Sequence, residues 1–239
     1  MLIRTYDAAI SDGEWKTFLA ARDFGELIAS GRGRDVPIVV PTHFIYDGDH
    51  TIRLHLALPN PVWEALAENP LALVSVYGDY SYIPTQWNAN PGAPVEYGVP
   101  TSYYAAVQAI VRTRNVDDPE ELAEILRAQL AHFQPEGGHA QVRPDNDYGK
   151  QLSGIRGIVG TIEEVRAKFK YGGNKTVEHR LRIADRLAER DRGLDQSARA
   201  QLLRRTESSL FRSFQAQKRP SYTRHDAGLP DAKRSGRNS

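Results

Sequence analysis

Short runs rich in valine, isoleucine and aromatic residues, separated by turn residues, constrain the fold of this chain most strongly. Gly31-Arg32-Gly33 and Asp47-Gly48-Asp49 are typical of tight turns, so the flanking segments are expected to be strands, the second turn closing a hairpin. The alternating strand–helix pattern of a doubly wound sheet is missing. The sequence predicts a mainly β protein, an antiparallel barrel with attached helices, with strands at residues 24–29, 36–46, 51–57, 71–77, 99–116 and 155–166.

Helices are expected where capping signals precede an apolar periodicity. Ser11 and Glu14 have the spacing of a capping box. Asn60 before Pro61 is a favoured helix start, and Asp118 before Pro119 is another. These signals, together with the apolar spacing, predict helices at residues 11–22, 61–68, 118–133 and, with a break near residue 193, 177–203.

The composition of the chain excludes several classes of protein. The 239 residues include no cysteine, which rules out disulfides, thiolate metal sites and a cysteine nucleophile. The net charge of +1 does not suggest a strongly basic nucleic-acid-binding body. No apolar run approaches the about 20 residues that cross a bilayer, and the N-terminus lacks the apolar core of a signal peptide. A cytoplasmic protein with no membrane segment is therefore expected.

The charge is concentrated at the C-terminus. Residues 211–239 contain seven basic and two acidic residues, which leaves the rest of the chain with a net charge of −4. This segment has few large apolar residues, and its prolines and glycines interrupt any periodicity. We therefore expect a folded domain over residues 1–210, which includes a C-terminal helix, and a basic, disordered tail over 211–239. Such a tail is either a solvated extension or a contact for DNA or another anionic partner.

Most short motifs in the sequence depart from the known functional motifs that they resemble. The glycines between Gly154 and Gly160 have the wrong spacing for a dinucleotide loop and lead into a strand. Residues 172–176 resemble the end of a phosphate-binding loop but have Asn174 where glycine is required. His43 and His55 could meet across the predicted hairpin, but no third ligand is identifiable, so no metal site is expected. The nucleophile motif G-x-S-x-G is absent.

Polar and aromatic residues around the predicted strands remain as candidates for a binding site. Residues 79–97 form a long polar and aromatic stretch, too long for an idle loop. The start of the helix at Asn60 has free backbone N–H groups that favour a phosphate, although an ordinary N-cap explains Asn60 equally well. Packing in the core or at an interface is as plausible for the aromatic residues. The candidates are Pro41, Thr42, His43, His55, Asn60, Trp87, Thr101, Tyr103, Lys170 and Asn174.

The order of several motifs resembles the PaiB family, described as FMN-binding negative transcriptional regulators. The similarity covers residues 1–205 and leaves the basic tail outside. It rests on Pro41-Thr42-His43-Phe44-Ile45, Leu54-His55-Leu56-Ala57, Asn60-Pro61-Val62-Trp63, Tyr82-Ile83-Pro84-Thr85-Gln86-Trp87, Val99-Pro100-Thr101, Ala106-Val107-Gln108-Ala109, Arg114 and Asp117-Asp118-Pro119-Glu120.

This resemblance implies an FMN-binding split barrel, usually a homodimer with FMN at the subunit interface. It implies that the FMN phosphate lies near the start of the helix at Asn60 and the ring near Thr42 and His43. Lys170 and Asn174 would approach the phosphate or ring edge, with Trp87 or Tyr103 over the flavin face. The chain departs from the family at residues 102–104 and at Gly172-Gly173, where the lost side chains leave room for a different ligand or a repositioned flavin.

Three functions compete on the sequence alone. The first is the flavin-binding negative transcriptional regulator that the resemblance implies. The second is a flavin-dependent oxidoreductase that acts on an unknown small molecule, in which the flavin performs the redox chemistry. The third is a barrel without a cofactor that scaffolds a complex.

Overall fold

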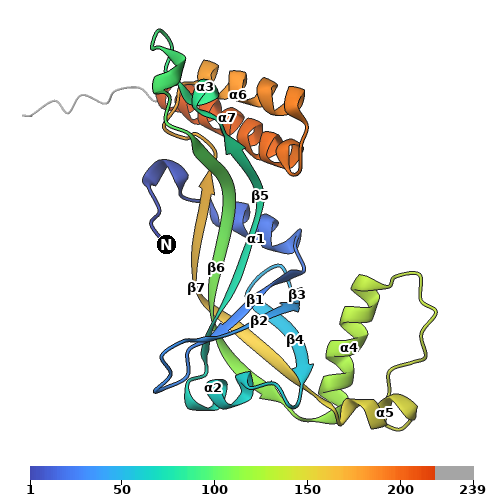
Figure 1. Ribbon diagram of the computed structural model, residues 1–239. Coiled ribbons are helices and arrows are strands. Elements are labelled where there is room, and N and C mark those ends of the chain that lie inside the picture. The colour runs from blue at the N-terminus through green and yellow to red at the C-terminus, as the bar shows by residue number, and fades with distance from the viewer. Residues whose placement is uncertain (219–239) are drawn as a thin grey trace, which may run out of the picture.

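The computed structural model describes residues 1–218 and shows one seven-stranded antiparallel sheet with attached helices (Figure 1). The strand order is β2-β1-β5-β6-β7-β4-β3, and the sheet does not close on itself. Three long strands form its centre, and β6 pairs with β7 over nearly its whole length. The predicted antiparallel split barrel is confirmed, with the central strands β5 at Leu71–Ile83, β6 at Thr101–Val116 and β7 at Ile155–Lys170.

The shorter strands build the lower part of the barrel. Strands β1 and β4 have the predicted bounds, Phe24–Ala29 and Thr51–Ala57. The strand predicted at residues 36–46 is two strands, β2 (Ile38–His43) and β3 (Ile45–Tyr46), and only β3 pairs with β4. Phe44 causes the break, because its side chain is buried in the core and its backbone N–H donates to the Asp23 carbonyl oxygen.

Two helices and a second apolar cluster close the lower end of the sheet. Helix α2 (Val62–Glu68) contacts β1 and β2, and α4 (Pro119–Phe133) lies beside β4 and β7 (Figure 1). The Asp118 carboxylate caps α4 by accepting hydrogen bonds from two backbone N–H groups, as the sequence predicts. The segment between α4 and β7 contains a short helix, α5 (Asp147–Leu152).

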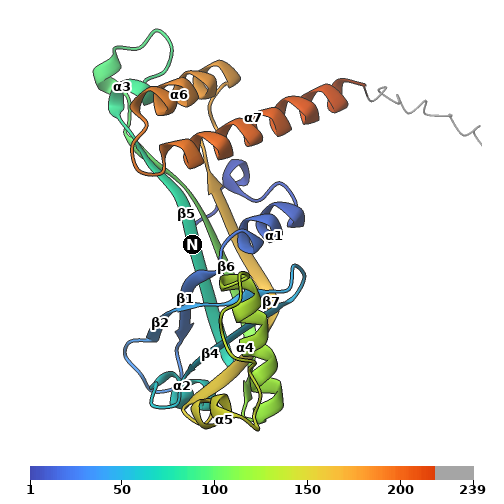
Figure 2. The ribbon, with the colours of Figure 1, turned by 90° about the vertical axis from the view of Figure 1, so that its right-hand side faces the viewer.

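The central strands extend beyond the barrel, where helices cover one face of them (Figure 2). Buried residues of α1, α6 and α7 join the main core, and the Phe18 and Phe169 rings meet edge to face, with centroids 5.6 Å apart. The elements of this upper part are η1 at Thr5–Asp7, α1 at Asp12–Ala20, α3 at Thr85–Asn88, η2 at Val95–Tyr97, α6 at Val177–Arg190 and α7 at Asp195–Lys218.

A buried ion-pair cluster fastens α7 to the N-terminal segment. The Glu14 carboxylate accepts hydrogen bonds from Arg204, at 2.6 Å, and Arg205, at 2.8 Å. The predicted capping box is wrong, because Ser11 makes no side-chain capping bond and Glu14 instead accepts the Ile10 N–H. Breaking a buried ion pair costs more free energy of unfolding than losing a helix cap. The contact of Glu14 with α7 therefore stabilises the fold more than a cap at this position would.

Helix α7 continues through the predicted domain boundary at residue 210. The predicted disordered tail lies outside the described residues from 219 onward. Within residues 1–218, no helix is long and apolar enough to cross a bilayer.

Candidate flavin site

The predicted site residues lie in two groups toward opposite ends of β7 (Figure 1). His55 pairs with Gly157 near the start of β7, whereas Tyr104 pairs with Lys170 at its end. At the rise of an extended strand, these positions are about 40 Å apart. No small ligand can therefore contact both groups within one chain. The lower group is Pro41, Thr42, His43, His55 and Asn60, and the upper group is Trp87, Thr101, Tyr103, Lys170 and Asn174.

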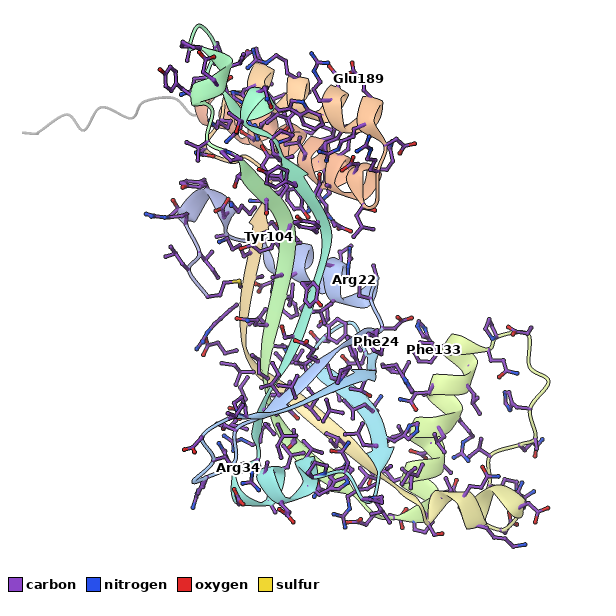
Figure 3. The ribbon with its side chains drawn as sticks, viewed as in Figure 1. Arg22, Phe24, Arg34, Tyr104, Phe133 and Glu189 are labelled. Atoms are coloured by element: carbon purple, nitrogen blue, oxygen red, sulfur yellow. The ribbon has the colours of Figure 1, made fainter. Side chains whose placement is uncertain are left out.

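In the upper group, two lysines flank the ring of Tyr104, which Figure 3 labels. The Lys168 and Lys170 ammonium groups are 5.5 and 6.0 Å from the ring centroid. Lys170 Nζ also donates to Thr101 Oγ1 at 2.6 Å, and Lys168 Nζ donates to the Leu2 carbonyl at 2.9 Å. Neither lysine forms an ion pair with a carboxylate among the described residues, so their positive charge remains available to an anion.

Asp7 is a buried carboxyl that interacts electrostatically with Lys168 and Lys170. Burial raises the pKa of Asp7, and the charges of Lys168, Lys170 and Arg205 oppose that shift only in part. A carboxyl whose pKa is raised holds its negative charge less firmly than an exposed one. Asp7 and the two lysines therefore interact electrostatically at this end of β6 and β7.

Tyr104, Lys168 and Lys170 lie on a face of the sheet that no described helix covers. Directly paired residues point to the same side of a sheet, which places Tyr77 with Ala106 and Tyr82 with Ser102. Tyr77 is 68% exposed and Tyr82 is 48% exposed. We call this surface the open face; its residues are Tyr77, Tyr82, Ser102, Tyr104, Ala106, Lys168 and Lys170.

The open face combines exposed rings with unpaired cations. Planar aromatic ligands stack on exposed tyrosine rings, and lysines bind phosphate groups. Lys168 and Tyr104 are not among the ten candidates, and the last strand, expected to end at residue 166, instead continues to Lys170 and carries both lysines. The spacing of Lys168 and Lys170, two residues apart, is the strand signal that would have placed both on one face.

Tyr103 lies on the opposite, buried face of β6. Only 2% of this residue is exposed, so it cannot cover a ligand on the open face as predicted. Burial raises the pKa of Tyr103, and its hydroxyl has no hydrogen-bond partner among the described residues. Tyr103 is a core residue of the upper part, packed edge to face against Tyr171.

The glycine pair at residues 172 and 173 leaves no extra room. A Cβ at Gly172 would collide with the Tyr103 hydroxyl, and one at Gly173 would collide with the Tyr6 carbonyl oxygen. Gly172 also has a φ of +66°, which favours glycine. The expected space for a different ligand is thus filled by this chain's own groups. Asn174, in the same turn, is exposed to solvent.

In the lower group, two histidines contact helix α4. His55 Nδ1 lies 2.6 Å from Gln129 Oε1, and the His43 ring lies 5.6 Å from His55 and 5.1 Å from Phe133. Figure 3 shows Phe133 at the end of α4 that faces the barrel. Burial lowers the pKa of His55, and the neighbouring His43 adds to this, against the opposing bond from Gln129. His55 is therefore a neutral imidazole at pH 7.

Sequence reasoning missed Gln129, because α4 was examined only for its apolar stripe. Gln129 is 3% exposed, and its Nε2 has no partner among the described residues. A buried polar residue on a helix has no local sequence signal that separates it from a solvated one.

The other predicted residues of the lower group have structural roles. Thr42 is buried, and its hydroxyl donates to the neighbouring His43 carbonyl. Asn60 precedes the N-cap residue of α2, Pro61, and its Oδ1 accepts the Val62 N–H at 3.0 Å. Pro41 is exposed. Within residues 1–218, no group of three or more His, Asp or Glu side chains is arranged to hold a metal ion.

The open antiparallel sheet with attached helices is the frame on which these groups lie. Residues 1–164 match the family described as "Putative FMN-binding domain". Because the match spans more than half of the chain, this protein belongs to that family. A search of curated protein sequences finds no match.

Solved structures with the same fold include proteins from two bacteria. The flavocytochrome Anf3 of Azotobacter vinelandii is 21% identical with a TM-score of 0.55, and the match covers 71% of this chain and 73% of that one. The FAD and heme binding protein of Mycobacterium smegmatis is 18% identical with a TM-score of 0.54, covering 72% and 78%. At these identities the likeness establishes the fold alone.

Proposed function

We propose that this protein binds FMN on the open face. The observation that carries the proposal is the pair of lysines around the Tyr104 ring, which form no ion pair with any described residue. Lys168, Lys170 and the Thr101 hydroxyl would hold the phosphate, and the exposed ring of Tyr77 and the half-buried ring of Tyr104 would contact the flavin ring. FMN, when bound, supplies electron and hydride transfer, and the protein supplies orientation and the electrostatic environment.

We further propose that the site is completed by a second copy of the chain. The open face exposes several tyrosines, and the lower group of His43 and His55 is too far along the sheet to act on the same ligand within one chain. A symmetric interface over the open face would place the lower group of one subunit near the upper group of the other. A monomeric mass in light scattering at micromolar concentration would contradict this arrangement.

The test of the FMN site is the replacement of Lys170 by Ala. A charge-assisted hydrogen bond contributes about 1.5–3 kcal/mol, so FMN should bind at least about tenfold more weakly. Quenching of flavin fluorescence, titrated into protein freed of its cofactor, measures the affinity. Lys150→Ala is the control, because the Lys150 side chain is 84% exposed on α5, and it should bind FMN like wild type.

Two outcomes of this titration contradict the proposal. If wild type shows no saturable binding, the chain does not carry FMN. If Lys170→Ala binds as tightly as wild type, the phosphate does not lie where we place it, even though the flavin assignment stands.

For the biological role, we propose regulation of transcription through DNA contact. The basic segment 211–239 is the observation that favours it, because seven positive charges can neutralise phosphates on DNA. Salt-dependent binding to promoter DNA, lost on deletion of residues 219–239, would support this role.

The second candidate role is a flavin-dependent oxidoreductase. It is favoured by the neutral imidazole of His55 beside His43, which could position a small substrate or accept a proton from it. Reduction of bound flavin by a nicotinamide cofactor, with no affinity for DNA, would select this role over the first.

A further inference from the structure

A pocket lies apart from the open face, between the long segment after β5 and helix α6. Its volume is about 570 Å³, and we call it the loop pocket. Figure 3 labels Glu189 on the same helix, at the upper end of the molecule. The pocket shares no residue with the open face. Part of its wall belongs to residues 79–97, the polar and aromatic stretch that is too long for an idle loop. Its principal lining residues are Trp87, Asn90, Pro91, Val95, Arg182 and Arg186.

The charge of the loop pocket is positive and only weakly compensated. Arg182 and Arg186 stand four residues apart on α6, where like charges repel each other. No Asp or Glu lines the pocket. Arg186 donates to Glu189 at 2.8 Å in an exposed pair, and Arg182 forms no hydrogen bond or ion pair with any described residue. Two guanidinium groups in this position are suited to bind a carboxylate or phosphate.

Nearby groups add to this positive potential. Lys175 Nζ donates to Asn90 Oδ1, a lining residue, at 3.1 Å. His179 is buried one turn before Arg182, and its Nε2 has no partner among the described residues. Burial and the charges of Lys175 and Arg182 lower the pKa of His179, so this ring is neutral at pH 7 and adds no charge of its own.

The remaining wall of the pocket is apolar and includes a fixed indole. The Arg190 guanidinium lies 4.6 Å from the centroid of Trp87, and a hydrogen bond joins the Trp87 backbone to His179. Pro91 and Val95 supply further apolar surface. A ring that is already held in place loses little freedom when a ligand contacts it.

From this combination we infer a second binding site: the loop pocket takes a small aromatic molecule that carries a carboxylate or a phosphate. The guanidinium groups of Arg182 and Arg186 bind the anionic group, and Trp87, Pro91 and Val95 contact the ring. The site is independent of the proposed FMN site, because neither its cations nor its indole belongs to the open face.

Isothermal titration calorimetry on the full chain as purified tests the inference, with benzoate and phenyl phosphate as probes and benzyl alcohol as the neutral analogue. Saturable binding of either anion is expected, with benzyl alcohol at least about tenfold weaker. The double variant Arg182→Gln, Arg186→Gln should bind the anion at least about tenfold more weakly for each lost guanidinium. The control is Arg53→Gln, Arg112→Gln, which removes the same charge from exposed positions on β4 and β6 and should bind like wild type.

Three results would overturn the inference. The first is that neither anion shows saturable binding. The second is that benzyl alcohol binds as tightly as the anions, and the third is that the Arg182, Arg186 variant binds them as tightly as wild type. A flavin titration separates the two sites, because this variant should bind FMN like wild type. If it loses FMN while Lys170→Ala does not, the loop pocket is the flavin site itself and the second site does not exist.

Discussion

Replacing Asp195 by Asn tests the energetics of the turn that joins α6 to α7. The Asp195 carboxylate accepts two hydrogen bonds from Arg190, at 2.6 and 2.7 Å, and one from Ser81 Oγ at 2.8 Å. The Arg192 N–H donates to it as well. Only 3% of the Asp195 side chain is exposed, so water cannot replace these partners when the charge is removed.

The magnitude follows from the pKa of Asp195. Hydrogen bonds from Arg190 above all, then from Arg192 and Ser81, lower this pKa from 3.8 to about 2, against burial, which raises it. The difference corresponds to about 2.5 kcal/mol of stability at pH 7. Because the pKa is lower in the folded state, this stabilisation is complete above about pH 4 and is lost as the pH falls through 2.

The assay is thermal unfolding of wild type and variant at pH 7 and at pH 3. At pH 7, Asp195→Asn should melt about 5–10 °C below wild type, and the difference should shrink at pH 3. Asp145→Asn is the matched control, because Asp145 has the same two-bonded contact with an arginine, Arg143, on the exposed surface. Exposed pairs contribute little, so this variant should melt like wild type. Equal melting of the two variants would refute the argument from burial.

Three further changes have defined outcomes. Gly172→Ala should lower the free energy of unfolding by about 1–3 kcal/mol, because a Cβ meets the Tyr103 hydroxyl at a positive φ; unchanged urea unfolding would contradict this. Glu14→Gln should cost about 3–5 kcal/mol in the same assay, since it leaves the buried Arg205 without a counter-charge. Gln129→Leu should lower the pKa of His55 further, because the bond from Gln129 raises it; an unchanged or raised value in an NMR titration would show that the bond is not made.

The sequence by itself determined the class of fold and much of its local structure. Strands β1 and β4 have the expected bounds, and Asp118 caps α4 as expected, because turn residues, caps and apolar spacing act within a few residues of each other. The resemblance to an FMN-binding family also stood on ordered motifs that the chain itself contains. These local signals do not depend on which distant segments pair with each other.

Only the tertiary structure decided which residues meet. Lys170 reaches Thr101 because β7 continues beside β6, and Gln129 reaches His55 from a helix 74 residues further along the chain. Tyr103 is buried and Tyr104 only half-buried, because the two side chains point to opposite faces of β6. Glu14 left its predicted capping role because two arginines of α7 pack against it. These outcomes depend on strand register and on packing between distant segments, which no local pattern in the sequence encodes.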